Sequence, residues 1–244
     1  MIGVILAIKL PTLLLLVWAF LRPEETLRPG RRYWCLFAVA AFHVLLALLS
    51  FMGKESSLSE MFVAYPLLWA VMLRNPLRRA LPPPVPLLVM GVVTCLLLWF
   101  EETWVIVDKH SPPLNHYIHY FGFYVGMAAT IVLLYSRVRY SVLQTFVVGC
   151  LWGVLVEQQF LVPKMLASGA VVQALLFALY IAPVYGLYLA APRLLFLEEF
   201  DRPTRTSRWQ GIWLFVAISV VPLATWALWS LILRPTGFDR TGVP

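Results

Sequence analysis

The stretch "QGIWLFVAISVVPLATWALWSLIL", residues 210–233, decides the class of fold, because none of its 24 residues is charged. An α-helix rises about 1.5 Å per residue, so a helix of this length crosses the ~30 Å hydrocarbon core of a bilayer. The stretch lacks the alternation of apolar and polar residues that a strand of a membrane β-barrel requires. It therefore predicts a transmembrane α-helix.

Composition extends this prediction to the rest of the chain. Of the 244 residues, 61% are hydrophobic and 13% are charged, whereas a soluble domain has about 45–50% and about 25%. Apolar runs of about twenty residues recur from one end of the sequence to the other. The sequence thus predicts an all-α fold: a polytopic integral membrane helical bundle that forms a single transmembrane domain over residues 1–244.

We expect about eight transmembrane helices, separated by joints that contain Pro and Gly. The expected ranges are 2–21, 33–52, 59–73, 84–107, 117–135, 141–162, 169–192 and 210–233. The first apolar run has neither a basic segment before it nor a small-residue cleavage site, so it is expected to be a retained helix.

The distribution of basic residues predicts the orientation of these helices. Thirteen Lys and Arg residues fall in the connections after helices one, three, five and seven, and five fall on the opposite side. Connections on the cytoplasmic side are enriched in Lys and Arg. We therefore expect both termini to be extracytoplasmic, in a plasma or inner membrane. The net charge of +7 follows from these connections and predicts no nucleic-acid partner.

Three cysteines, Cys35, Cys95 and Cys150, all lie inside apolar runs and show no C-x-x-C spacing. This placement is typical of small packing residues, and it predicts neither a disulfide framework nor a zinc site.

Ionisable residues lie at one depth in the predicted bundle. In "LLLWFEETWV", residues 97–106, Glu101 lies about six residues from the outer end of its helix. Glu157 and Lys9 lie at similar distances from the outer ends of their own helices. Ionisable groups inside a membrane usually face the bundle interior and pair with one another. We therefore predict a polar cluster in the outer leaflet, to which Glu101 contributes rather than its neighbour Glu102.

Two pairs of glycines predict how the fifth and sixth helices pack. Gly122 and Gly126 are four residues apart in one helix, and Gly149 and Gly153 are four residues apart in the next. Such small-x-x-x-small spacing lets two membrane helices approach closely. A tight turn at "SRVRY" joins the two helices, so we expect an antiparallel hairpin in which Gly122 faces Gly153 and Gly126 faces Gly149.

The same register places His119 opposite Glu157 at the outer end of the hairpin. A carboxyl group among apolar side chains holds its proton more tightly than one in water, and a histidine partner can share that proton. The predicted catalytic set is Glu157 as general acid or base, His119 as its partner, Glu101 as second carboxylate and Lys9 as charge partner.

This set predicts acid–base chemistry on a lipid or an isoprenoid-like substrate, such as isomerisation, cyclisation, hydration or hydrolysis. The expected partners are membrane lipids, an amphiphilic or lipid-like small molecule and, for some functions, other membrane proteins. No cofactor is expected. The pair His116 and His119 has a spacing that could share a metal ion, but the sequence lacks the E-x-x-H and H-E-x-x-H patterns of helical metal sites.

Two other classes of function fit the same residues. An accessory or structural subunit of a larger membrane complex would use a Lys9–glutamate ion pair only to hold its bundle together. A proton-coupled small transporter would use the cluster as a relay, although the inner halves of the helices are nearly featureless. The sequence shows no G-x-S-x-G, phosphate-binding loop or G-x-G-x-x-G motif, and we identify no family resemblance.

Overall fold

The computed structural model describes residues 30, 34, 37, 38, 41, 74, 77, 79–81, 84–99 and 113–236. Every regular element in these residues is a helix, and they contain no strand. The expected helices over 2–21 and 59–73 lie outside the described residues. Four described positions, 34, 37, 38 and 41, fall in the helix expected over 33–52, and all four are helical.

Three described helices are long and apolar enough to cross a membrane, and a fourth candidate is a broken pair of helices. The predicted class, an all-helical membrane protein, agrees with these spans. The chain divides into two compact units, which are described separately below. Unit 1 comprises Met1–Ala80 and Ser141–Leu195, and unit 2 comprises Leu81–Tyr140 and Phe196–Pro244.

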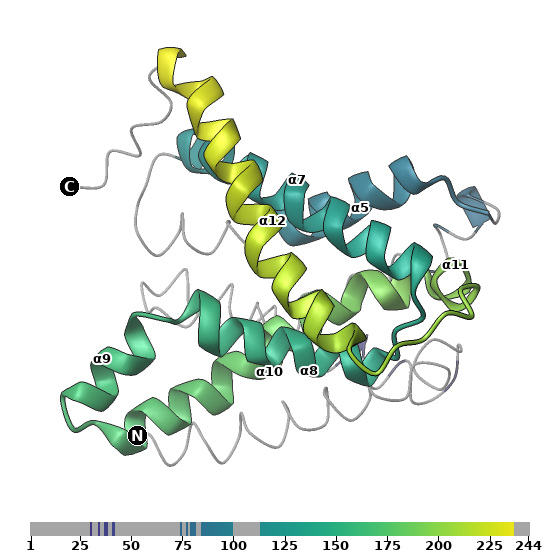
Figure 1. Ribbon diagram of the computed structural model, residues 1–244. Helices are drawn as coiled ribbons and strands as arrows, with labels where there is room; N and C mark the ends of the chain where they lie inside the picture. Colours follow the sequence, from purple (N-terminus) through teal and green to yellow (C-terminus); the bar gives the residue numbers. More distant parts are fainter. Residues whose placement is uncertain are drawn as a thin grey trace. The chain divides into compact units, whose positions relative to one another are not determined.

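Three helices form the described part of unit 2: α5 (Leu87–Trp99), α7 (Pro113–Arg137) and α12 (Gln210–Leu233). The long helix α7 packs against α12 on one side and α5 on the other (Figure 1). The short helix η2 (Arg234–Thr236) continues α12. The bounds of α12 agree with the helix predicted at 210–233, because the whole stretch is apolar and only Pro222 interrupts it.

Close contact between α7 and α12 depends on the two glycines of α7. A Cβ atom at Gly122 would overlap the Cβ of Trp229, and a Cβ at Gly126 would overlap the hydroxyl group of Thr225 and lie 3.1 Å from the Cα of Pro222. Hydrogen in place of a side chain therefore lets the two helix backbones approach closely.

The connection between α10 and α12 is fixed to the end of α7. It contains the short helix α11 (Leu197–Asp201), whose Phe200 is fully buried against Tyr135 at a ring separation of 5.3 Å. The buried Gln210 side chain donates to the carbonyl oxygen of Arg139 at 3.0 Å and accepts from the backbone N–H of Ser207 at 3.0 Å. These bonds satisfy backbone groups that the connection would otherwise leave unpaired.

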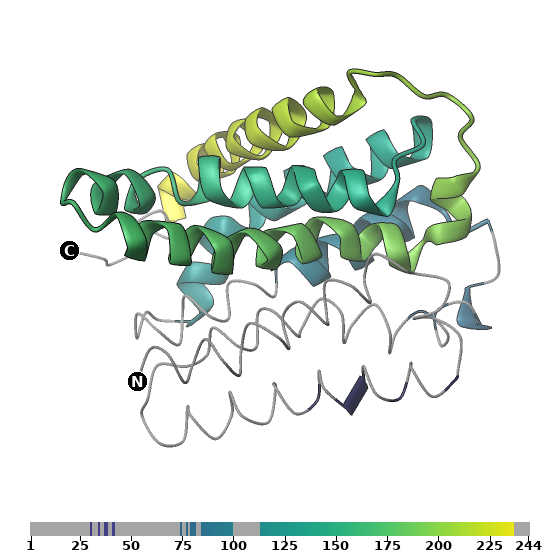
Figure 2. The same ribbon diagram turned by 90° about the horizontal axis from the view of Figure 1, so that it is seen from below.

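Unit 1 contains a helical hairpin in its described part. Helix α8 (Val142–Trp152) begins at a capping box in which Ser141 accepts from the Gln144 N–H and the Gln144 side chain accepts from the Ser141 N–H. A π-helical turn, η1 (Gly153–Glu157), follows, then α9 (Leu161–Ala167) and α10 (Val171–Leu195). Helices α8 and α10 lie side by side (Figure 2).

The sixth predicted helix, 141–162, is therefore not continuous. Residues 158–160 form turns, and α9 bends away from the α8–η1 segment by 64°. Gly169, with φ of 77°, ends the turn after α9, since glycine adopts this left-handed conformation without strain. By contrast, α10 runs through both Pro183 and Pro192 and closely matches the helix predicted at 169–192.

Gly149 of α8 and Gly153 of η1 pack against α10. A Cβ at Gly149 would lie 2.5 Å from the carbonyl oxygen of Tyr185 and 2.9 Å from the Cα of Gly186, and a Cβ at Gly153 would overlap the Tyr185 ring. The predicted glycine register, with Gly122 on Gly153, is therefore wrong. Small-residue spacing identifies a face that can be approached closely, but it does not identify which helix approaches it.

Candidate functional site

Glu157 occupies the break in the α8–α9 span. It is the last residue of η1, and the backbone N–H of Gln158 closes the π-helical turn by donating to the carbonyl oxygen of Gly153 at 3.1 Å. Its side chain is exposed, with the exposed apolar side chains of Leu155 and Phe160 nearby in the sequence. Single π-helical turns inside α-helices occur frequently at functional sites.

Trp152 and Tyr185 support this turn from within unit 1. Their rings meet edge to face at 5.5 Å, and both side chains are buried. Because Gly153 lies directly on the Tyr185 ring, α10 supports the start of the turn whose end carries Glu157. The break is therefore anchored by packing at its α8 side.

His119 lies in unit 2 in an aromatic environment. Its side chain is 8% exposed, and its ring meets Tyr120 at 4.9 Å and Trp226 at 5.4 Å, both edge to face. Tyr120 and Trp226 in turn stack in parallel at 6.0 Å. These ring contacts fix the orientation of the imidazole at the α7–α12 interface.

The other predicted site residues cannot be placed in the same way. Lys9 and Glu101 lie outside the described residues, and His116 lies in α7 with a side chain outside the described part. The glycine register from which the pairing of His119 with Glu157 was predicted is wrong. The two residues belong to different units, so the pairing itself stays a prediction. Among the described residues, no group of three or more His, Cys, Asp or Glu side chains could hold a metal ion.

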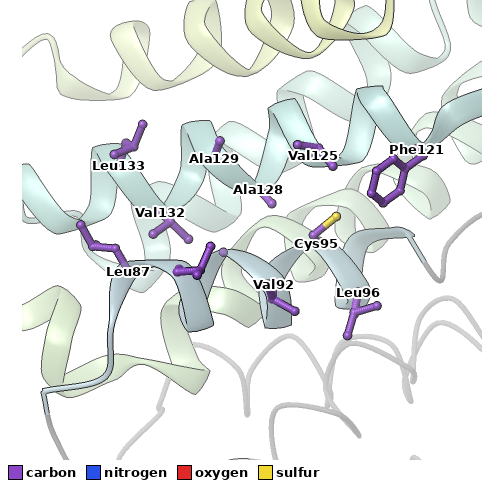
Figure 3. Close-up of a pocket in the computed structure, with 12 residues that line it drawn as sticks. Leu87, Val92, Cys95, Leu96, Phe121, Val125, Ala128, Ala129, Val132 and Leu133 are labelled. Carbon is purple, nitrogen blue, oxygen red and sulfur yellow. The ribbon is translucent and has the colours of Figure 1, made fainter. Parts of the chain in front are cut away.

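A groove that sequence reasoning missed runs between α5 and α7 in unit 2 (Figure 3). Its volume is about 530 Å³, in the range of about 300–1,000 Å³ typical of small-molecule sites. The lining residues share an apolar character: Leu87, Leu88, Gly91, Val92, Cys95, Leu96, Phe121, Val125, Ala128, Ala129, Val132 and Leu133. The only signal in the sequence is the small size of three of them, Gly91, Ala128 and Ala129.

Aromatic rings close one end of this groove. Phe121 lines the groove and meets Trp99 at 5.3 Å and Trp229 at 5.4 Å. The Trp99 indole N–H donates to the carbonyl oxygen of Tyr117 at 3.0 Å, which fixes the last residue of α5 against α7. The two glutamates, Glu101 and Glu102, follow Trp99 by two and three residues in the sequence.

The opposite end of α7 is polar and carries Arg137 in its last turn. Beyond it, Arg139 forms an ion pair with Asp201 at 3.7 Å. Burial raises the pKa of Tyr140, because its phenol ring lies in the unit 2 interior against Tyr135 and a phenolate there would lose its hydration.

Comparison of the chain with protein-family models, curated proteins and solved structures found no match.

Proposed function

We propose that the protein is a membrane-embedded enzyme that performs acid–base chemistry on a lipid or isoprenoid-like substrate. Glu157 acts as general acid or base, His119 as its partner, Glu101 as second carboxylate and Lys9 as charge partner. The observation that supports this proposal best is the position of Glu157, at the end of a π-helical turn where a candidate membrane span breaks.

Two physical arguments connect that position with catalysis. An ionisable residue inside an apolar span costs free energy, so it is kept for a functional reason by default. A break in the span also leaves backbone groups outside the regular hydrogen bonding of a helix. Membrane proteins tolerate such backbone where it is buried in protein or lines a cavity. The exposed Glu157 carboxyl group can thus meet an amphiphile that diffuses within the membrane.

The proposal includes the finer topology expected from the sequence. It has eight transmembrane helices, both termini extracytoplasmic and a plasma or inner membrane location, so that Glu157, Lys9 and Glu101 share the outer leaflet. The alternation of Arg-rich and Arg-poor connections supports this topology.

The broken span also favours a second candidate function, proton-coupled transport. Transporters bind their substrates at discontinuous membrane helices, and α8–η1 with α9 has this form. A transporter needs the transmembrane proton gradient, whereas a lipid-modifying enzyme does not. A protonophore therefore separates the two functions.

The test uses cells in which the gene is deleted and then restored as wild type, Glu157→Gln, Glu101→Gln or His119→Gln. Extracted lipids are compared by liquid chromatography and mass spectrometry. If the protein is an enzyme, the deletion strain should accumulate one lipid. The wild type should convert this lipid with or without protonophore, and the three variants should not convert it. Glu198→Gln, which removes a carboxyl group from α11 in unit 2, is the matched control and should restore conversion.

Two results would contradict the proposal. One is an unchanged lipid profile in the deletion strain. The other is full conversion by Glu157→Gln together with a lowered melting temperature, which would make Glu157 a purely structural residue.

A further inference from the structure

We propose that the groove between α5 and α7 binds one acyl chain of a membrane phospholipid, whose phosphate group lies at Arg137. This inference does not rest on the proposed acid–base function. It uses the apolar lining residues and Arg137, none of which has a role in the proposed acid–base chemistry.

The lining of the groove selects hydrocarbon. Eleven of its lining residues are apolar side chains or glycine, and the twelfth, Cys95, is a weakly polar thiol that points from α5 toward α7 (Figure 3). Sites for polar small molecules carry convergent hydrogen-bonding groups that fix the ligand's orientation. Within a bilayer, a groove without such groups offers only van der Waals packing, which a hydrocarbon chain can supply along its length.

The length of the groove fits one membrane leaflet. Its α5 wall runs from Leu87 to Leu96, nine residues or about 14 Å at ~1.5 Å per residue. Its α7 wall runs from Leu133 to Phe121, twelve residues or about 18 Å at the same rise. Half of the ~30 Å hydrocarbon core is about 15 Å, so one acyl chain of a membrane lipid can lie along the groove.

The sides of the groove are open to a lipid. Leu88, Val92 and Leu96 repeat every four residues along one face of α5, and they are 80%, 52% and 50% exposed. Small residues, Gly91 on α5 and Ala128 and Ala129 on α7, leave the space between the two helices. A Cβ atom at Gly91 would meet no atom within 4 Å, so this glycine borders open space.

The positive charge of Arg137 assigns the phosphate group of the lipid to the end of the groove near Leu133. Arg137 follows Leu133 by four residues and is therefore on the same face of α7, about 6 Å further along the axis. Its side chain is exposed, and a guanidinium group binds phosphate through paired hydrogen bonds. The other end is closed by the rings of Phe121 and Trp99, which suit the tail of the chain.

The test uses the full-length protein in nanodiscs that contain a phospholipid with a photoreactive diazirine in the middle of one acyl chain. Cross-linked peptides from residues 87–99 and 121–133 are compared with peptides from α12, whose Leu228 and Leu231 are both 62% exposed and measure contact with bulk lipid. The wild type should show several-fold more labelling in the groove than on α12. Gly91→Leu, which fills the groove, should reduce groove labelling to the α12 level.

Gly91→Ala is the matched control, because it removes the same glycine but leaves most of the groove empty; its labelling should stay near wild type. Arg137→Gln should also reduce labelling of the groove, and it keeps the test decisive if Gly91→Leu does not fold, since Arg137 is exposed. Parallel arms use a photoreactive free fatty acid and a photoreactive isoprenoid alcohol.

Three outcomes would overturn the proposal. Equal labelling of the groove and α12 in the wild type would make the groove ordinary lipid surface. Labelling unaffected by Gly91→Leu, or by Arg137→Gln, would place the lipid elsewhere. Stronger labelling by the fatty acid or isoprenoid probe than by the phospholipid would assign the groove to a different occupant.

Discussion

The indole N–H of Trp229 donates a hydrogen bond of 2.6 Å to the carbonyl oxygen of Ile118, and this bond joins α12 to α7. It lies beside Gly122, whose missing side chain leaves room for the Trp229 Cβ. The carbonyl oxygen of an α-helix normally accepts a bond from its own helix, so Trp229 adds a second donor. One tryptophan thus supplies both the packing and the polar contact at this end of the α7–α12 interface.

Gly122→Ala should destabilise the protein by about 1–3 kcal/mol, the range for an extra methyl group in a close-packed interface. The added methyl group would overlap Trp229 and lie 3.0 Å from the Thr225 carbonyl oxygen. Unfolding in mixed micelles with increasing denaturing detergent measures the change. Gly91→Ala is the control: it meets no neighbour and should be neutral or gain about 0.5–1 kcal/mol from the loss of glycine's backbone freedom.

Gly149→Ala should lower the stability of the α8–α10 hairpin by about 1–3 kcal/mol. Its methyl group would meet the Tyr185 carbonyl oxygen and the Gly186 Cα, which are backbone atoms that cannot move aside without shifting α10. The same detergent titration measures the loss. A variant as stable as the wild type would mean that α8 and α10 are less closely packed than described.

Gln210→Leu should cost about 1–3 kcal/mol, because it leaves the Arg139 carbonyl oxygen and the Ser207 N–H without their side-chain partner. Hydrogen exchange should rise in residues 196–209, since these bonds hold that connection to α7. Thr204→Ala, at an exposed position of the same connection, should change stability by less than about 0.5 kcal/mol. Equal exchange in both variants would contradict the assignment.

Tyr140 should make stability depend on pH in the alkaline range. Burial raises its folded-state pKa above the unfolded value of about 10. The folded state therefore favours the protonated phenol, and this contribution is fully present below the unfolded pKa and lost as pH rises through the folded pKa. Tyr140→Phe should flatten the loss of stability above about pH 10. Parallel melting curves against pH for both proteins test this.

The fold followed from the sequence where hydrophobicity alone determines structure. The uninterrupted apolar run of α12 was predicted to the residue, and α7 and α10 within a few residues, because a bilayer requires helices of that length. The helix α11 was predicted as part of a loop. Its formation depends on the burial of Phe200 against Tyr135, which is a contact between distant parts of the chain.

The candidate site could be predicted less well. Glu157 was found because a carboxyl group in an apolar run is conspicuous, but the π-helical turn below it was not, since the residues Gly153 to Val156 are as apolar as those of a regular helix. The groove between α5 and α7 was also missed. It is a property of two facing surfaces, and the small size of Gly91 does not by itself show that the space beside it is empty.

The π-helical turn also makes chain length a determinant of chemistry. A turn of this kind contains one residue more than the α-helical turn it replaces. Deleting Leu155 within the turn would restore a regular turn with the Glu157 carboxyl group in nearly the same direction. Deleting one residue of the regular helix α8 would instead rotate that carboxyl group about the helix axis by about 100°, the angle per residue in an α-helix. The direction of that carboxyl group is therefore encoded by the number of residues before it, and a deletion variant can redirect it while every side chain of the proposed site is kept.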